Sequence, residues 1–168
     1  MKLKVKYHDE KMPKLKKIQE GNWIDLSVVE NRTVVVREGK EFPAKWELNE
    51  KGEKVLRYKK GDFLKLSTGL TIATPDGYEV YVAPRSSTFQ KYGLILVNSI
   101  GIGDTSFRGN EDVYMMPMFA LMDGEVCLYD RVGQFRIQES MSDLTIEEVE
   151  DTGYSNRGGF GTTGSGRL

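Results

Sequence analysis

Apolar and polar residues alternate along much of the chain. Leu3, Val5 and Tyr7 are separated by lysines, and the segment 78–82 places apolar residues at every second position. Successive side chains of a β-strand point to opposite faces of a sheet, so a period of two predicts strands. The same pattern, bounded by Gly, Asp, Asn or Pro, predicts further strands at 33–37, 54–58, 63–66, 70–73, 94–97, 113–121, 125–129 and 132–137.

Only two short helices are expected, at 9–19 and 87–92. Many short strands with turn residues between them are typical of a sandwich or jelly roll, so we expect an all-β fold with one or two short helices. The 168 residues, 39% of them hydrophobic, suit one compact domain. We place this domain at 1–152, followed by a Gly-rich segment at 153–168.

Charge and composition exclude several classes of function. The 24 Lys and Arg against 25 Asp and Glu give a net charge of −1, which provides no field for coating nucleic acid or an anionic membrane. The single Cys127 excludes an internal disulfide, and the single His8 argues against a His-based metal cluster and His-dependent nucleophilic catalysis. No apolar run is long enough to span a membrane and no signal peptide is recognisable, so we expect the cytoplasm.

Two segments have the residue types of an anion site. The tail 156–164 combines Gly backbone N–H groups, Thr hydroxyls and Arg157 into a phosphate cradle, and its Phe160 would cap a base. A disordered tail explains the same composition. The segment 83–88 follows a strand and directs Ser hydroxyls, N–H groups and Arg85 at one point, either as an anion site or as an ordinary helix N-cap.

Three carboxylate or amide side chains are candidates for chemistry. The segment 97–109 alternates apolar residues with Gly up to Asp104 and then turns, which predicts a β-hairpin whose backbone approaches a flat ligand. Asp104 is then a turn residue bonded to its own backbone, or a general base that orients water. Asp25 interrupts an apolar run and Gln134 lies in a predicted strand, and each is also explained as a structural polar residue.

Five segments, taken in order, resemble the five motifs of the trimeric dUTPase family, whose members hydrolyse dUTP to dUMP and pyrophosphate. They are IDL at 24–26, PRSS at 84–87, NSIGIGDTSFRG at 98–109, DRVGQ at 130–134 and RGGFGTTG at 157–164. The resemblance implies a distorted jelly-roll subunit in a homotrimer, with three active sites that each take residues from all three chains. It also implies dUTP as the substrate, no direct nucleic-acid or membrane partner, and a bacterial cell or a phage-infected host.

The resemblance further implies the role of each site residue. Asp104 matches the base that activates the attacking water, and Gln134 contacts the α-phosphate beside it. Uracil and deoxyribose would be bound by Asn98, Gly101, Ile102, Gly103, Phe107 and Phe160. The phosphates would be bound by Arg85, Ser86, Ser87, Gln134, Arg157, Gly161, Thr162 and Thr163. Asp25 matches the acid that holds, through water, a Mg²⁺ coordinated by the triphosphate.

The sequence departs from the family pattern at several positions. Phe107 stands where the family usually has Tyr, and Gly103 stands where it usually has Ile or Val, which is expected to loosen the packing under the base. Ser155 occupies the place of the usual motif-five Arg, with Arg157 two residues later. The stretch 36–65 is longer than the usual link between motifs one and two, and predicts a surface hairpin or a partner-binding arm.

Three alternatives therefore stay open beside dUTP hydrolysis. One is a dCTP deaminase-like enzyme of the same fold family, which reads cytosine through an exchanged hydrogen-bond pattern. Another is a catalytically idle, nucleotide-binding regulatory trimer, which is suggested by the departures from the motifs at Gly103, Phe107 and Arg157. The third is a non-enzymatic β-sandwich module, which fits the composition but leaves the order of the motifs as coincidence.

Overall fold

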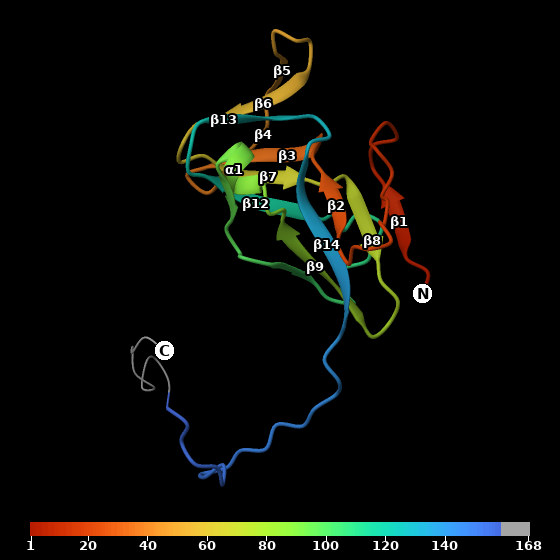
Figure 1. Ribbon diagram of the computed structural model, residues 1–168, viewed down its shortest axis with the longest axis vertical. Coiled ribbons are helices and arrows are strands. Elements are labelled where there is room, and N and C mark those ends of the chain that lie inside the picture. The colour runs from red at the N-terminus through yellow and green to blue at the C-terminus, as the bar shows by residue number, and fades with distance from the viewer. Residues whose placement is uncertain (159–168) are drawn as a thin grey trace.

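The structure, a computed structural model that describes residues 1–158, is almost entirely β (Figure 1). Its strands are β1 (Lys4–Tyr7), β2 (Ile24–Ser27), β3 (Val29–Arg37), β4 (Lys40–Pro43), β5 (Trp46–Leu48), β6 (Lys54–Tyr58), β7 (Phe63–Ser67), β8 (Leu70–Ala73), β9 (Tyr78–Pro84), β10 (Leu94–Leu96), β11 (Gly101–Gly103), β12 (Met115–Ala120), β13 (Gly124–Cys127) and β14 (Arg131–Glu139). The one helix among these residues is α1 (Thr88–Tyr92), inside the expected segment 87–92. Every strand predicted from the alternation overlaps an observed strand, so the all-β prediction is confirmed.

The strands form four sheets over one core. Their orders are β10-β12-β7-β3-β4, β11-β9-β14-β2, β13-β6-β5 and β1-β8. Leu26 and Phe135 of the four-stranded sheet meet Leu64 and Met116 of the five-stranded sheet in a single buried hydrophobic cluster. Full burial of such a side chain stabilises a fold by roughly 1.5–3 kcal/mol. The four-stranded sheet is therefore held firmly on its inner face, which fixes the positions of the side chains on its outer face.

The segment 9–19 is not helical, so the second expected helix is wrong. Pro13 stands in this segment, and a proline removes a backbone donor and clashes with the preceding turn of a helix. The chain instead runs past β1, where the backbone N–H of Leu15 donates to Tyr7 Oη at 3.0 Å. It then continues along the edge of the four-stranded sheet into β2.

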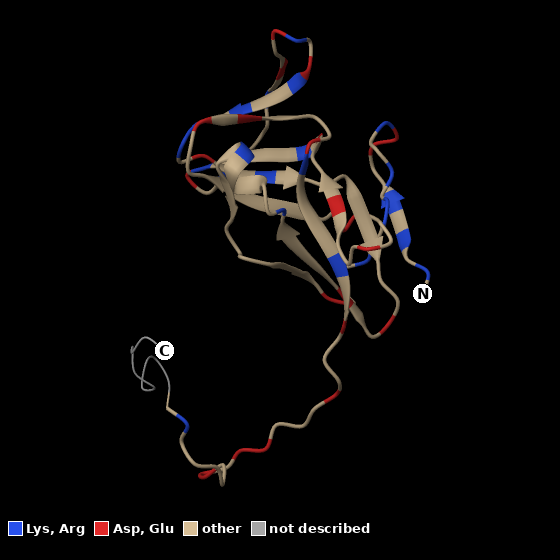
Figure 2. Cartoon of the chain, in the orientation of Figure 1, with Lys and Arg blue, Asp and Glu red and all other residues tan. Residues whose placement is uncertain are grey.

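The stretch 36–65 forms surface hairpins. Strand β4 pairs with β3, and the β5–β6 hairpin projects from the body of the molecule and joins β13 (Figure 1). Arg57 of β6 pairs with Glu47 and Glu125 on the two neighbouring strands, and all three side chains are exposed. Charged residues of both signs follow one another along this hairpin (Figure 2). Exposed ion pairs contribute only about 0.2–1 kcal/mol each. Strand β4 is exposed, as expected of a surface hairpin, whereas Val55, Leu56 and Tyr58 of β6 belong to the core. A role of this stretch in binding a partner stays a prediction.

The last strand, β14, ends at Glu139, and an extended segment follows it. The Ser140 N–H still donates to the carbonyl oxygen of Gly77 at 2.9 Å, but every residue from 141 to 158 is exposed. This segment runs away from the sheets and is rich in acidic residues (Figures 1 and 2). Among residues 1–158, no helix is long and apolar enough to cross a membrane.

Candidate active site

The four-stranded sheet β11-β9-β14-β2 gathers four of the five motif segments. β2 carries Asp25, β14 carries Gln134, β9 leads into Arg85, and β11 is the Gly101–Gly103 segment of motif three. Gln134 lies opposite Asp25 on one side and Ala83 on the other. Antiparallel pairing thus brings segments that are far apart in the sequence onto one face.

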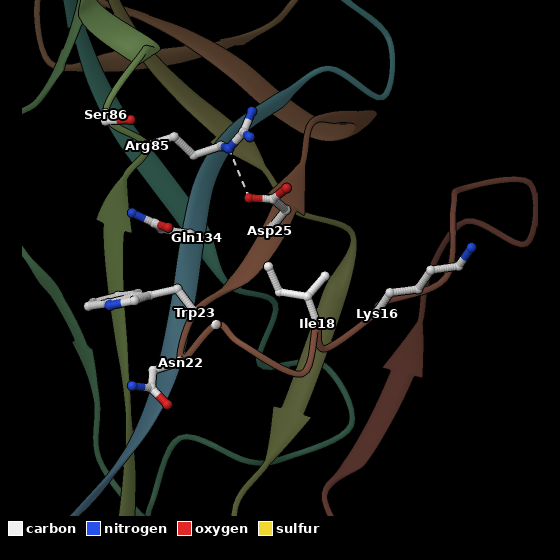
Figure 3. Close-up of a pocket in the computed structure, with 9 residues that line it drawn as sticks. Lys16, Ile18, Asn22, Trp23, Asp25, Arg85, Ser86 and Gln134 are labelled. Atoms are coloured by element: carbon white, nitrogen blue, oxygen red, sulfur yellow. Dashed lines mark ion pairs between the residues drawn. The ribbon is translucent and has the colours of Figure 1, made fainter.

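A cavity of about 380 Å³ lies over the β9-β14-β2 part of this sheet. Its lining includes Asp25, Arg85, Ser86 and Gln134, so residues of motifs one, two and four meet there (Figure 3). Lys16 belongs to the same lining, but its side chain projects away from the other polar groups (Figure 3). The structure therefore brings together four of the predicted site residues in one cavity.

Asp25 is the electrostatic centre of this cavity. Its Oδ1 lies 2.8 Å from Arg85 Nε, and its Oδ2 lies 2.8 Å from Arg131 Nη1. Arg131 is the second residue of the DRVGQ segment, and the sequence did not mark it as a site residue. Gln134 Nε2 donates to the Pro84 carbonyl oxygen at 3.0 Å, which fixes the amide beside the ion pair. The cavity thus offers the Arg85 guanidinium and the Asp25 carboxylate to a charged ligand, and Arg131 lines a neighbouring cavity that shares Asp25.

Thr88 positions the PRSS turn, and sequence reasoning missed it. Its side chain is buried, with Oγ1 accepting from the Arg85 N–H at 3.0 Å and donating to the Val132 carbonyl oxygen at 2.7 Å. Ser87, at the N-cap of α1, makes no side-chain capping hydrogen bond. Ser87 is thus the N-cap residue by position, but its side chain does not cap the helix. The Thr88 hydroxyl fastens motif two to motif four.

We expect Thr88→Val to loosen this turn. The substitution leaves the Arg85 N–H and the Val132 carbonyl without partners, and an unpaired buried polar group costs about 1–3 kcal/mol. Urea unfolding should show a free energy of unfolding lowered by about that amount. Thr88→Ser, which keeps the hydroxyl, is the matched control. Equal stability of the Val variant and the wild type would contradict this role.

Asp104 lies in an exposed turn directly after β11. Its Oδ1 accepts hydrogen bonds from the Ser106 N–H at 2.8 Å and from Ser106 Oγ at 2.5 Å, and its backbone carbonyl accepts from the Phe107 N–H at 3.1 Å. The bonds from the Ser106 hydroxyl and then the Ser106 N–H lower the pKa of Asp104. The turn-residue interpretation is confirmed. The same bonds keep the group ionised, which a general base requires.

For Asp104 as the candidate general base, Ser106→Ala is expected to change the pH dependence of the reaction it would catalyse. In the wild type, the hydrogen bond from the Ser106 hydroxyl stabilises the charged carboxylate of Asp104. Removal of this hydrogen bond raises the pKa of Asp104. The acid limb of the kcat/KM profile should move to higher pH, with little change at neutral pH, where the carboxylate is ionised in both proteins. Steady-state rates across the acid range measure this. A limb that stays in place or moves to lower pH would contradict the assignment.

Motif three does not form the predicted hairpin with the segment that follows it. β11 pairs instead with β9, with Ile102 opposite Tyr81. The expected looseness at Gly103 is also wrong, because Tyr114 fills the space: a Cβ on Gly103 would lie 2.0 Å from Tyr114 Oη. The side chain of Asn98 lies near Gly101, with its Nδ2 3.8 Å from where a Cβ would stand.

Phe107 lies in a different cavity from Asp25. This second cavity, of about 300 Å³, is lined by Phe107 with Arg32, Lys65 and other residues, and among residues 1–158 it shares no lining residue with the first. Phe107 is the one motif-three residue in the lining of the second cavity, so within the described residues of one chain it is separated from the cavity that holds Asp25, Arg85 and Gln134. Arg157 lies on the exposed segment after β14, and Phe160, Gly161, Thr162 and Thr163 lie outside the described residues.

The residues of the first cavity suit a divalent cation only in one way. Within residues 1–158, no three His, Cys, Asp or Glu side chains gather as a metal site, and Asp25 is the one carboxylate of the cavity lining. Mg²⁺ commonly keeps several waters and takes phosphate oxygens as ligands. The donor set therefore fits an ion carried by a polyphosphate and held by Asp25 through water.

Known proteins agree with this arrangement of fold and motifs. The sequence matches no established family model. It is 34% identical over 165 residues to the SPbeta prophage-derived deoxyuridine 5'-triphosphate nucleotidohydrolase YosS of Bacillus subtilis (strain 168), a match that covers 98% of this chain and 99% of that protein. An all-β protein with this order of motifs on one sheet is a dUTPase-type protein. The chain belongs to the dUTPase family.

Two solved structures share the fold. A point mutant of the Staphylococcus bacteriophage 80alpha dUTPase, solved with dUpNHpp, has a TM-score of 0.68 at 14% sequence identity, over 97% of this chain and 98% of that chain. A point mutant of the dUTPase from phage phi11 of S. aureus, described with a structural Mg(II) ion, has a TM-score of 0.65 at 13% identity, over 92% of this chain and 100% of that chain. At these identities the likeness establishes the fold alone.

Proposed function

We propose that this chain hydrolyses dUTP to dUMP and pyrophosphate. The observation that carries the proposal is the collection of motifs one to four on a single four-stranded sheet, in a chain similar to a named dUTP hydrolase over nearly its whole length. Neither the composition nor the fold class alone would select this reaction, because one fold hosts many functions.

The first cavity binds the triphosphate in this proposal. Arg85 presents a guanidinium fork, and Ser86, Ser87 and Gln134 add neutral hydrogen-bonding groups around it. In the described structure the counter-ion of Arg85 is Asp25. A bound triphosphate would replace Asp25 as the counter-ion of Arg85. Asp25 Oδ1 would then be free to accept hydrogen bonds from water.

Asp25 then holds a Mg²⁺ through water. When bound, the ion would neutralise charge on the triphosphate and help order its oxygens. The partial exposure of Asp25, whose side chain is 32% accessible, leaves room for such waters. Asp25→Asn would keep the hydrogen-bonding shape of the residue but remove its charge.

Asp104 is the general base. Its carboxylate, whose pKa is lowered by hydrogen bonds from Ser106, is ionised. It accepts a proton from water as the water oxygen attacks the α-phosphorus. The new bond joins the water oxygen to the α-phosphorus, and the bond from that phosphorus to the bridging oxygen breaks. Pyrophosphate leaves with the electron pair of the broken bond, and dUMP remains. Gln134 holds the α-phosphate in line for this displacement.

Uracil and deoxyribose bind at motif three. The backbone of Gly101, Ile102 and Gly103 faces the base together with Asn98, and Phe107 stacks under the sugar. Phe160 closes over uracil from the 153–168 segment, where Arg157, Gly161, Thr162 and Thr163 wrap the outer phosphates. Closure of this segment would exclude water other than the attacking one.

The two separate cavities support a homotrimer with shared sites. The Phe107 half and the Asp25 half of the site do not meet within residues 1–158 of one chain. Facing halves of neighbouring chains would make one site, and three identical contacts would close the ring. The segment 141–158 is exposed and directed away from its own sheets. In a trimer it would be free to bring Arg157 to the site of a neighbouring chain.

Turnover of a nucleotide panel tests the proposed reaction. Purified protein with Mg²⁺ should release pyrophosphate from dUTP and leave dCTP unchanged. Deamination of dCTP would support the deaminase-like alternative instead. Tight binding of dUTP without any product would support the idle regulatory trimer.

A further inference from the structure

Tyr114 is a buried aromatic residue that stands behind the motif-three segment. It is 6% exposed. Its N–H donates to the Leu70 carbonyl oxygen at 2.9 Å, and its own carbonyl accepts from the Thr68 N–H at 3.1 Å and from Thr68 Oγ1 at 2.8 Å. These bonds tie the main chain of Tyr114 to the link between β7 and β8. The backbone from which the Tyr114 ring extends is therefore held in place.

The hydroxyl end of this ring lies against Gly103. A Cβ at that position would lie 2.0 Å from Tyr114 Oη and 2.6 Å from both Cε1 and Cζ. Gly103 does not have a positive φ, so the glycine serves the close approach of the ring and not an unusual backbone conformation. The last residue of β11, directly before Asp104, thus rests on the phenol.

The same ring supports Phe107. The two ring centroids are 5.1 Å apart with an interplanar angle of 88°, an edge-to-face contact. Phe107 is 38% exposed and so presents its other side to the second cavity. Its N–H also donates to the Asp104 carbonyl oxygen at 3.1 Å. One ring therefore touches the residues on both sides of the Asp104 turn.

We infer that Tyr114 is a positioning residue that sets the preference for deoxyribose over ribose. The inference rests on the proposed function, in which Phe107 stacks under the sugar. An aromatic ring excludes a 2′-hydroxyl only while its height and tilt are fixed, and the edge contact with Tyr114 fixes them. Without that contact, Phe107 gains room to move back, and a ribose fits.

The test compares kcat/KM for dUTP and UTP in Tyr114→Met. Methionine fills the space flexibly but does not support the Phe107 ring, so the dUTP-to-UTP ratio should fall by about tenfold or more, mainly through a lower KM for UTP. Gly103→Ala places a methyl group against Tyr114 and pushes its ring away from Phe107. This substitution should also lower the dUTP-to-UTP ratio. Tyr114→Phe keeps the ring and should keep the ratio within about twofold.

Tyr58 provides a matched control in the same chain. It is 3% exposed, it bonds the Tyr92 carbonyl oxygen at 2.7 Å, and a Cβ on its neighbour Gly124 would lie 2.7 Å from its Oη. Tyr58→Met should lower stability and leave the dUTP-to-UTP ratio unchanged. An equal loss of ratio in Tyr58→Met would overturn the inference, because it would show a general effect of a weakened core.

The inference also fails if Tyr114→Met and Gly103→Ala both hydrolyse dUTP with the wild-type ratio. It fails as well if Tyr114→Phe loses the ratio, since the hydroxyl and not the ring would then be responsible. A wild-type protein that does not hydrolyse dUTP would refute the proposed function itself. These results are distinguished by the wild-type measurement alone.

Discussion

Asp104→Asn should lower kcat for dUTP by about 10²–10⁴-fold, the usual contribution of a positioned general base. Asparagine keeps the size of the side chain and an oxygen that accepts from the Ser106 N–H, but it accepts no proton from water. Because Asp104 is exposed and forms a local turn, the folded structure should survive the change. Steady-state kinetics and thermal unfolding of the same preparation measure both quantities.

Asp62→Asn is the matched control for this prediction. Asp62 is also a turn carboxylate, and its Oδ2 accepts the Lys59 N–H at 2.8 Å in the link between β6 and β7. It lies in neither half of the proposed site, so its variant should keep the wild-type kcat. A kcat for Asp104→Asn within a few-fold of the wild type would show that this carboxylate only shapes the turn.

Mixing two inactive variants should restore activity, the second large effect that the structure predicts. Asp104→Asn damages the motif-three half of the site, and Arg85→Ala damages the triphosphate half. If each site takes the two halves from neighbouring chains, random trimers from an equal mixture have about a quarter of their sites intact. Co-refolding the two variants and measuring pyrophosphate release should therefore give about a quarter of wild-type activity.

The control mixture joins two variants of the same half. Arg85 and Gln134 line one cavity, so Arg85→Ala mixed with Gln134→Ala should stay inactive in every combination of chains. Recovery in the first mixture and not in the control would support shared sites. Absence of recovery in the first mixture, with trimers present, would place both halves of each site within one chain.

The strands were predictable because their alternation is local. The β14 residues Gln134 and Phe135 show this directly, with Phe135 in the core and Gln134 on the cavity side. The helix expected at 9–19 failed because Pro13 and contacts with β1 decide that segment. Strands β2, β4 and β5 are short, and their pairing partners define them more than their own sequence does.

The site was predictable only as far as the motifs reach. Motif order selected Asp25, Arg85 and Gln134, and the sheet register then placed them together. Thr88 acts through both Arg85 and the distant Val132, and Tyr114 through Gly103 and Phe107 across a folded turn, so the alternation of apolar and polar residues marks neither of them. Their nearest signals were the threonine directly after PRSS and the unusual glycine before Asp104, since a missing side chain in a packed strand implies that a neighbour fills the space.

The central claim is that water attacks the α-phosphorus of dUTP. Hydrolysis of dUTP in ¹⁸O-labelled water, with mass analysis of both products, tests it most directly. The account predicts that dUMP gains one labelled oxygen and that pyrophosphate is released without label. Label in pyrophosphate, release of dUDP with inorganic phosphate, or the absence of turnover by folded protein would contradict it.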